Sequence, residues 1–180
     1  MKMSNKKFIK KMDDYFDKLS EAFDNPLDIK WIDNDDILRG LFTINDNIYQ
    51  IVCESKDNNI WKYDFYFYEK DKKFSPELTG FERDKFRVLP TIENGIEYLY
   101  NNKKVDCIIF GASDKSKGRK KLYTAFCEKF CEKNNLEFYT KVYNSDDIDR
   151  QIFVLYKEDI DKDILSETIL KILEEEKFGN

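Results

Sequence analysis

The chain has 180 residues, a net charge of −5 and no histidine. This length suits one domain with a substantial core. The negative charge argues against a nucleic-acid binder, because neutralising phosphates requires a basic face. The absence of histidine excludes a Ser-His-Asp triad, a Cys-His dyad and a mixed Cys/His metal site. Apolar residues make up 41% of the chain and aromatic residues 16%, which predicts a folded protein.

Four cysteines stand in or beside apolar segments: Cys53, Cys107, Cys127 and Cys131. No C-x-x-C pair occurs, so we expect buried, reduced thiols and no metal site. No N-terminal apolar segment resembles a secretory signal, and no run of about 18 apolar residues could span a membrane. These features predict a cytoplasmic protein without a membrane partner.

The first part of the chain predicts a helix followed by strands. Apolar residues spaced by three and four predict an amphipathic helix over residues 5–23. A short strand is expected over 28–32. The next three strand candidates are separated by turn formers and predict an antiparallel meander. They cover residues 37–44, 48–54 and 61–68. In the last of these, aromatic residues alternate with polar ones, which favours a face packed under helices over an aromatic ligand slot.

The segment 70–89 is the least regular part of the sequence. It is long for a connecting loop, so we interpret it as a candidate rim for a site. Pro90-Thr91 predicts the start of the next helix, which should end at Asn101-Asn102. Gly95 should weaken this helix, because glycine has a low helix propensity.

The next stretch carries the clearest indication of a site. It predicts a buried strand over 105–110, a loop rich in Gly, Ser and Lys over 111–118, and a helix opening with Arg119. Such a connection directs backbone N–H groups and the positive end of the helix dipole at one spot, which suits an anion. The expected donors are Ser113, Ser116, Lys117 and Arg119. The alternative is a capped helix whose lysines are solvated.

The remaining elements complete a mixed α/β domain. Strand candidates at 136–143 and 151–156 predict a hairpin, and apolar periodicity predicts a helix over 159–177. We expect a mixed sheet of about six or seven strands with helices on both faces. The strand at 105–110 should run parallel to the strand at 61–68, because a helix connects them.

The order of these elements over about residues 5–156 resembles the Gcn5-related N-acetyltransferase (GNAT) fold. The segments TGFERDKFRVLPTIENGIEYL and IIFGASDKSKGRKKLY also look like divergent GNAT-like proteins encoded by bacteriophages. This resemblance implies a single GNAT-like domain over residues 1–180, with the core at 5–156 and a C-terminal helix at 159–177. It also implies an N-acyltransferase that uses acetyl-coenzyme A or another acyl-coenzyme A donor and an amine acceptor.

The resemblance assigns roles to individual residues. Leu122-Tyr123 stands where the family often has a Leu-Tyr pair, whose tyrosine can protonate the departing coenzyme thiolate. Packing on the sheet with Phe126 and Phe130 is the alternative for Tyr123. The family's pyrophosphate loop begins with an Arg or Gln, for which Arg83 is the candidate here. The remaining candidates are Arg87 as a second basic residue of this segment, and Glu54 or Asp64 as the base.

One departure from the family keeps a second hypothesis open. Phe86 and Val88 stand where the family's loop has glycines, and bulky side chains there would keep a pyrophosphate from the backbone amides. The alternative function is a non-catalytic GNAT-like binding protein of a phage or mobile element, acting as a regulator or inhibitor of a host system. The expected partner is then a small anion or a protein.

Overall fold

The computed structural model of the protein describes residues 27–44, 47–68, 85–113, 117–145 and 148–178. The helix predicted over 5–23 and residues 70–84 of the irregular segment therefore lie outside the described residues.

The described residues form seven strands and three helices. In chain order these are β1 (Lys30–Asn34), β2 (Ile37–Ile44), β3 (Asn47–Ser55), β4 (Ile60–Tyr68), α2 (Lys85–Asn102), β5 (Cys107–Ser113), α3 (Lys117–Asn134), β6 (Glu137–Ser145), β7 (Ile148–Tyr156) and α4 (Lys162–Phe178). None of these three helices combines the length and the apolar character needed to cross a membrane.

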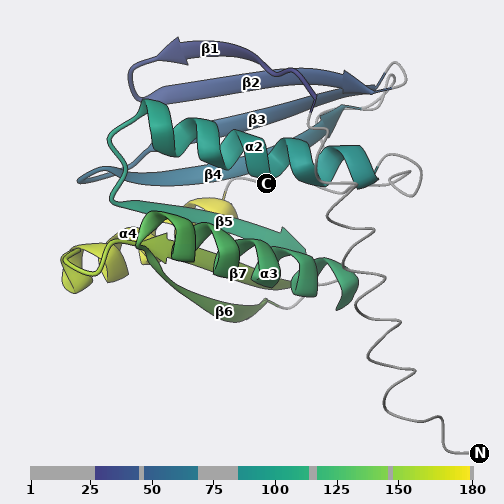
Figure 1. The fold of residues 1–180 in the computed structure, drawn as a ribbon. Coiled ribbons are helices and arrows are strands. Elements are labelled where there is room, and N and C mark those ends of the chain that lie inside the picture. Colours follow the sequence, from purple (N-terminus) through teal and green to yellow (C-terminus); the bar gives the residue numbers. More distant parts are fainter. Residues whose placement is uncertain (1–26, 45–46, 69–84, 114–116, 146–147, 179–180) are drawn as a thin grey trace, which may run out of the picture.

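All seven described strands belong to one mixed sheet, in the order β1-β2-β3-β4-β5-β7-β6 (Figure 1). Neighbouring strands are antiparallel except β4 and β5, which run parallel and are connected by α2. The predictions of a mixed α/β sheet, of an antiparallel meander and of a parallel pair in its centre are confirmed. The predicted hairpin also forms, and its second strand, β7, lies between β5 and β6.

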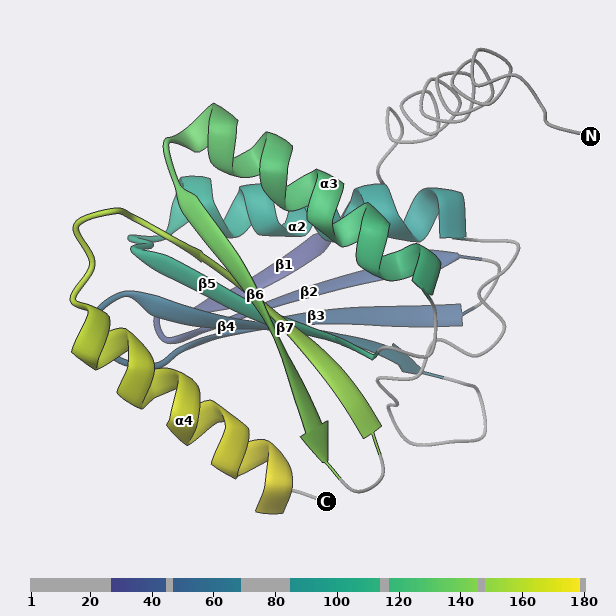
Figure 2. The same cartoon turned by 90° about the horizontal axis from the view of Figure 1, so that it is seen from below.

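Alternating residues of β5 belong to two separate apolar clusters. Ile108 and Phe110 pack in a cluster that contains residues of α2 and α3. Cys107 and Ile109 pack in another cluster, with Leu165 and other residues of α4. Successive side chains of a strand point to opposite faces of the sheet, so these helices contact different faces. Figure 2 shows α2 and α3 on one side of the sheet and α4 on the other.

The helix α2 begins earlier than the sequence predicted. Its first residue is Lys85, and Pro90 lies inside the helix instead of starting it. A proline there forfeits one backbone hydrogen bond. Val88 and Leu89 are buried, so the additional turn contributes apolar surface to the core and offsets that loss. The prediction of irregular structure was therefore wrong for residues 85–89.

The connection from β5 to α3 is shorter than predicted. Gly111 belongs to β5 and Gly118 belongs to α3, so the predicted loop over 111–118 was wrong at both ends. Residues 114–116 lie outside the described residues. The strand is longer because its antiparallel pairing with β7 continues as far as Ser113, which lies opposite Arg150.

Gly95 allows α2 to pack closely on the sheet. A Cβ atom at this position would lie 2.5 Å from Tyr63 Oη and 2.7 Å from Ile51 Cδ1. Cβ atoms essentially never make contacts this short, so a side chain here would force α2 or the side chains of Tyr63 and Ile51 to shift. The sequence indicated only the lower helix propensity of Gly95, whereas its main effect is on packing.

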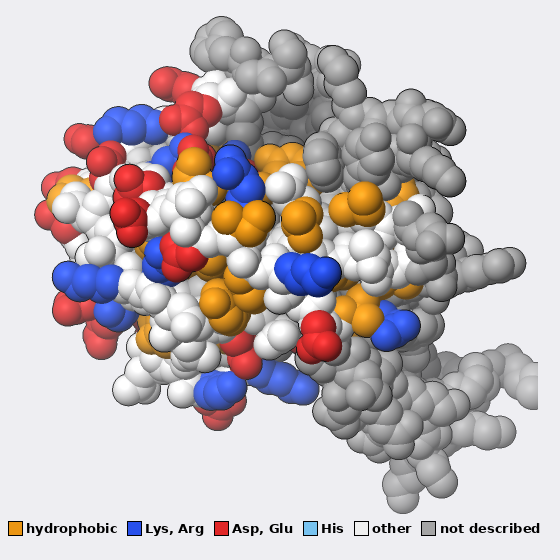
Figure 3. Space-filling view, turned by 90° about the horizontal axis from the view of Figure 1, so that it is seen from above, with side chains coloured by type: hydrophobic (Ala, Val, Ile, Leu, Met, Phe, Trp, Pro, Cys, Tyr) orange, Lys and Arg blue, Asp and Glu red, His pale blue; other side chains and the backbone are white. Residues whose placement is uncertain are grey.

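The edge strand β1 is fixed to the end of α2. The Trp31 ring stacks on Tyr98 with 4.3 Å between ring centroids, and Lys103 forms an ion pair with Asp33. Figure 3 looks onto this edge of the sheet and shows hydrophobic side chains between acidic and basic ones. β1 therefore adds to the packing of α2 although most of its own residues are exposed.

Candidate functional site

The central parallel strands pair over only part of their length. β4 and β5 pair from Ile60 opposite Cys107 to Tyr63 opposite Phe110. Beyond this point β4 stays paired with β3, and β5 stays paired with β7. The sheet therefore divides into two parts after Tyr63 and Phe110. The carboxyl-terminal parts of β4 and β5 are therefore not hydrogen-bonded to each other.

The N-termini of α2 and α3 lie at this same end of the sheet. Each helix follows one of the two parallel strands and runs back along the sheet, so both start at the carboxyl ends of β4 and β5 (Figures 1 and 2). Neither helix has an acidic residue in its first turn. The positive ends of both helix dipoles and the basic residues in both first turns therefore favour an anion at this end of the molecule.

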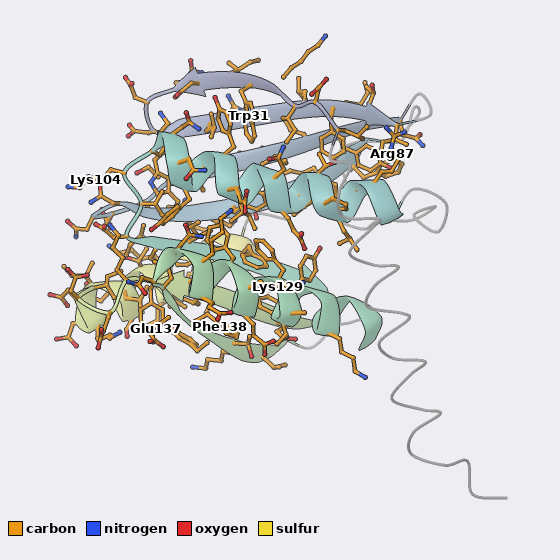
Figure 4. All side chains as sticks on the ribbon, in the orientation of Figure 1. Trp31, Arg87, Lys104, Lys129, Glu137 and Phe138 are labelled. Carbon is orange, nitrogen blue, oxygen red and sulfur yellow. The ribbon has the colours of Figure 1, made fainter. Side chains whose placement is uncertain are left out.

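The structure brings four of the predicted anion-binding residues to this end. Arg87 is exposed in the first turn of α2 (Figure 4). Ser113 is the last residue of β5, and Lys117 and Arg119 belong to the first turn of α3. The other two, Arg83 and Ser116, lie outside the described residues. Residues that are distant in sequence thus come together at one end of the sheet, the carboxyl ends of β4 and β5.

The first turns of α2 are anchored to the core. Val88 is fully buried, so its side chain points toward the sheet and away from the exposed side of the helix. Thr91 Oγ1 donates a hydrogen bond to the Arg87 carbonyl (2.6 Å) and accepts one from the Leu27 N–H (2.9 Å). The start of α2 is therefore held in a defined position against the core and the segment that precedes β1.

Tyr123 packs on the sheet at the point where the strands separate. Its ring centroid lies 5.8 Å from that of Phe110 and 5.7 Å from that of Phe153, in edge-to-face arrangements. Phe110 is the last residue of β5 that pairs with β4. Tyr123 is only half-buried, so its ring contacts the core while part of the residue faces solvent.

Tyr63 is a second tyrosine on this face, and its hydroxyl is used structurally. It donates a hydrogen bond to the Ile92 carbonyl (2.9 Å), which ties β4 to α2. Burial raises the pKa of Tyr63 well above its ordinary value, and negative charge on Cys53, Tyr123 or Glu93 would raise it further. Tyr63 is therefore neutral and fixed.

Gln151 places an unused hydrogen-bond donor on the same face. It lies on β7, two residues from Phe153, and is only 2% exposed. Residues two apart on a strand share a face and lie about 7 Å apart. Among the described residues, Nε2 of Gln151 has no hydrogen-bond acceptor. Most buried polar groups are paired, and an unpaired one calls for a structural or functional explanation. Its position opposite Ala112 is near the carboxyl end of β5.

Glu93 is an acid on this face that the sequence analysis did not select. It is half-buried on α2, and burial raises the pKa of its carboxyl to about 7, although Lys129 of α3 lowers it. Figure 4 labels Lys129 on α3. The spacing was a usable signal, because Glu93 stands four residues after Leu89 and three before Ile96, both of which are buried.

The acids chosen from the sequence lie on the other face of the sheet. Glu54 is opposite Lys62 and pairs with Lys56 at 2.7 Å, and Lys56 also bonds to Glu175 of α4. Asp64 forms an ion pair with Lys62 at 3.0 Å. These residues alternate with Tyr63, which packs under α2. Of the acids considered, Glu93 is the one on the face that carries Tyr123.

A depression of about 300 Å³ lies at the opposite end of β4 and β5. Its lining includes Asn58, Ile60, Asp106, Lys157 and Asp159. Burial would raise the pKa of Asp106, but hydrogen bonds from Lys157 and Asn59, both 2.7 Å long, lower it overall. These groups satisfy one another and join the start of β5 to the end of β7, which indicates a structural role.

The cysteines have no features of a reactive or metal-binding site. All four are buried and free, and burial raises the pKa of each thiol. The prediction of buried, reduced thiols is confirmed. Within the described part of the chain, no group of three His, Cys, Asp or Glu residues could hold a metal ion.

Comparisons with known proteins give no assignment. No protein family, curated protein or solved structure matches this chain.

Proposed function

We propose that this protein is a GNAT-like N-acyltransferase that binds an acyl-coenzyme A donor where β4 and β5 separate. The observation that carries the proposal is the end of parallel pairing at Tyr63 and Phe110. It leaves the carboxyl ends of two parallel strands apart, beside the N-termini of α2 and α3. In open α/β sheets, ligands bind outside the carboxyl ends of the strands.

The two ends of an acyl-coenzyme A match different parts of this site. Its phosphates require N–H donors and positive charge, which the first turns of α2 and α3 supply. Its thioester arm is narrow and largely uncharged, and fits between separated strands. The buried orientation of Val88 removes one of the two objections to coenzyme binding raised by the sequence, because this side chain does not cover the outer surface of the helix.

The proposed reaction is the attack of an amine nitrogen on the thioester carbonyl. A C–N bond forms, the C–S bond breaks, and the coenzyme leaves as a thiolate. The amine loses a proton to a carboxylate, and Tyr123 donates its hydroxyl proton to the thiolate. Glu93 is the candidate acceptor, because a carboxyl with a pKa of about 7 is substantially deprotonated at neutral pH and still basic enough to take a proton.

The proposed reaction gives the unpaired N–H donor of Gln151 a role. The thioester carbonyl gains negative charge when the amine attacks, and a fixed N–H donor at that oxygen stabilises the charge. Nε2 of Gln151 is buried on β7, two residues from Phe153, which Tyr123 contacts. A carbonyl acceptor on the bound donor would satisfy this group.

The second candidate is a non-catalytic GNAT-like binding protein that regulates or inhibits a host system. The packing of Tyr123 favours it, because a ring held against Phe110 and Phe153 also serves the core alone. In this case the same end of the sheet binds an anion or a protein without turnover.

Acetyl-coenzyme A and coenzyme A are the ligands that test the proposal. Binding to the native state at 100 times the dissociation constant stabilises a protein by about 2.7 kcal/mol, which thermal unfolding detects. Transfer to a panel of amines is followed as free thiol released from the coenzyme. The protein's own thiols give little background because they are buried. Binding with transfer supports the enzyme, and binding without transfer supports the second candidate.

The location of the site is tested with paired charge deletions. Lys117→Ala with Arg119→Ala removes two cations from the first turn of α3, so we expect weaker binding of acetyl-coenzyme A. Lys104→Ala with Lys133→Ala removes two exposed cations near the C-terminal ends of α2 and α3 and should leave binding unchanged. Equal effects of the two pairs would contradict a site at the carboxyl ends of β4 and β5.

A further inference from the structure

The strand β6 forms a long exposed edge of the sheet. It spans nine residues and is the last strand in the sheet order. Figure 2 looks onto this edge, and β6 lies in front of the other strands. Among the side chains of residues 137–142, which the structure describes, two large apolar ones are exposed: Tyr139 (38%) and Val142 (44%). An edge of this length and composition is a template for pairing with another strand.

We propose that β6 pairs antiparallel with β6 of a second copy of this chain, about a two-fold axis at Tyr139. In such a pair the opposing residues face the same side of the sheet, and their numbers have a constant sum. A centre at Tyr139 places Glu137 opposite the second copy's Lys141, and Lys141 opposite its Glu137. The segment Glu137-Phe138-Tyr139-Thr140-Lys141 is therefore complementary to itself.

Side chains on both faces of β6 fit this register. Glu137, Tyr139 and Lys141 share the face of Val154 and Ile152, and both charged residues are exposed. Directly opposite side chains have Cβ atoms about 4.5–5.5 Å apart, close enough for two Glu–Lys ion pairs around a Tyr139 pair. On the other face, Val142 would lie opposite the second copy's Leu136. Figure 4 labels Glu137 and Phe138 at the start of β6.

Alternative centres lack this complementarity. A centre at Lys141 would place two lysines opposite each other, and a centre at Thr140 would place Lys141 opposite Tyr139. A lysine on an edge strand usually discourages pairing. Here Glu137, four residues earlier and on the same face, provides a counter-charge in the register centred on Tyr139.

The other edge of the sheet does not offer a similar match. β1 has only five residues. A centre at Ile32 would place Lys30 opposite Asn34 and Trp31 opposite Asp33, which gives no pair of opposite charges. Self-association through β6 is therefore favoured over self-association through β1.

Charge exchange on β6 tests the proposal. Light scattering at rising protein concentration should show the wild-type mass approaching twice the chain mass of 21.7 kDa. Lys141→Glu places Glu137 opposite a glutamate, and Glu137→Lys places a lysine opposite Lys141, so each variant alone should remain monomeric. An equimolar mixture of these two variants restores both ion pairs and should form a heterodimer. Lys30→Glu on β1 is the matched control and should dimerise like the wild type.

Pairing through β6 can be distinguished from association through another surface. Circular dichroism confirms that the two charge variants are folded, since both changes are at exposed positions. A wild type that stays monomeric at every concentration overturns the proposal. So does a dimer that persists in Lys141→Glu, because it must use another surface, or two monomeric variants that fail to associate when mixed. None of these results depends on acyl-donor binding or transfer.

Discussion

Tyr63 and Phe110 form the last of the parallel residue pairs that join β4 to β5. Both residues are buried on the face covered by α2 and α3, and each is close to Tyr123. The proposed chemistry depends on this arrangement, because the same pair marks the end of the continuous sheet and the position of the tyrosine. Substitutions of Tyr123, Gln151 and Glu93 probe this face.

Tyr123→Phe tests the role of the hydroxyl. We expect acyl transfer to fall by about 10²–10⁴-fold if Tyr123 is the general acid, since a positioned acid contributes a factor of this size. The ring contacts with Phe110 and Phe153 are kept, so the free energy of unfolding should change by no more than about 0.5–1.5 kcal/mol. The rate of thiol release and urea unfolding measure the two effects.

Tyr98→Phe is the matched control for this variant. Tyr98 is also half-buried, but its ring stacks on Trp31 near the end of α2. It should retain full activity. An equal loss of activity in both variants, or no loss in Tyr123→Phe, would leave Tyr123 with a packing role only.

Gln151→Met should stabilise the protein and weaken ligand binding. Burying an N–H donor without an acceptor costs about 1–3 kcal/mol, and methionine fills a similar volume without that cost. The same change removes the donor proposed for the thioester carbonyl, so both acetyl-coenzyme A affinity and transfer should decrease. Urea unfolding and calorimetric titration give the two quantities.

The half-buried Gln50 on β3 supplies the comparison. Gln50→Met should leave acetyl-coenzyme A binding unchanged. A less stable Gln151→Met protein would show that Gln151 makes a stabilising hydrogen bond after all, and that outcome removes the argument for a ligand at Nε2.

Glu93 should make stability depend on pH. Its pKa is about 7 in the folded protein, whereas the ordinary value is 4.5. Between these two pH values the folded protein keeps the proton on Glu93, and the unfolded chain has released it. Stability should therefore fall as pH rises from about 4.5 to 7 and then level off. Glu93→Gln should remove this slope and be more stable than the wild type at pH 8 by about 1–3 kcal/mol.

The exposed Glu128 on α3 is the control for the pH experiment. Urea unfolding of Glu128→Gln should show the same decrease in stability between about pH 4.5 and 7 as the wild type. If Glu93→Gln kept it as well, the pKa of Glu93 would be close to its ordinary value, and its assignment as the proton acceptor would lose its support.

Gly95→Ala should destabilise the protein although alanine is the better helix former. In an exposed helix the substitution gains about 1 kcal/mol. Here the new Cβ would meet Tyr63 Oη and Ile51 Cδ1, and overpacking of a core costs about 1–3 kcal/mol. The urea midpoint should fall.

A double variant checks the cause of this loss. Adding Tyr63→Phe removes the closest atom, so Gly95→Ala should cost less in the Tyr63→Phe background than in the wild type. Additive effects would mean that Tyr63 and Gly95 do not interact.

The strands were predictable because the alternation of apolar and polar residues that identifies a strand is visible in a short stretch of sequence. Alternation identified residues 37–44 and 61–68 almost to the residue, and the connecting helix implied that β4 and β5 are parallel. The start of α2 was missed because Pro90 is a strong local signal for a first turn, whereas burial of Val88 and Leu89 by the sheet decides the outcome. Tertiary packing outweighed local preference there.

The site was only partly predictable. The basic first turn of α3 and the position of Tyr123 could be identified from the sequence. Gln151 could not, because it stands in an ordinary strand, and the pairing that places this strand between β5 and β6 involves distant segments. Glu54 and Asp64 were candidates for the base because they are carboxylates, but the strand register places them on the face opposite Tyr123. Contacts between distant segments determine these features.

The limited pairing between β4 and β5 also has consequences for folding kinetics. The meander of β2, β3 and β4 and the hairpin of β6 and β7 form through contacts close in sequence. Pairing Tyr63 with Phe110 must close a chain segment of 47 residues, and such non-local contacts form slowly. We expect the two halves of the sheet to acquire structure first and to join last. The amide hydrogens that join β4 to β5 should then exchange with solvent when the two halves separate. This exchange should be faster than exchange that requires global unfolding.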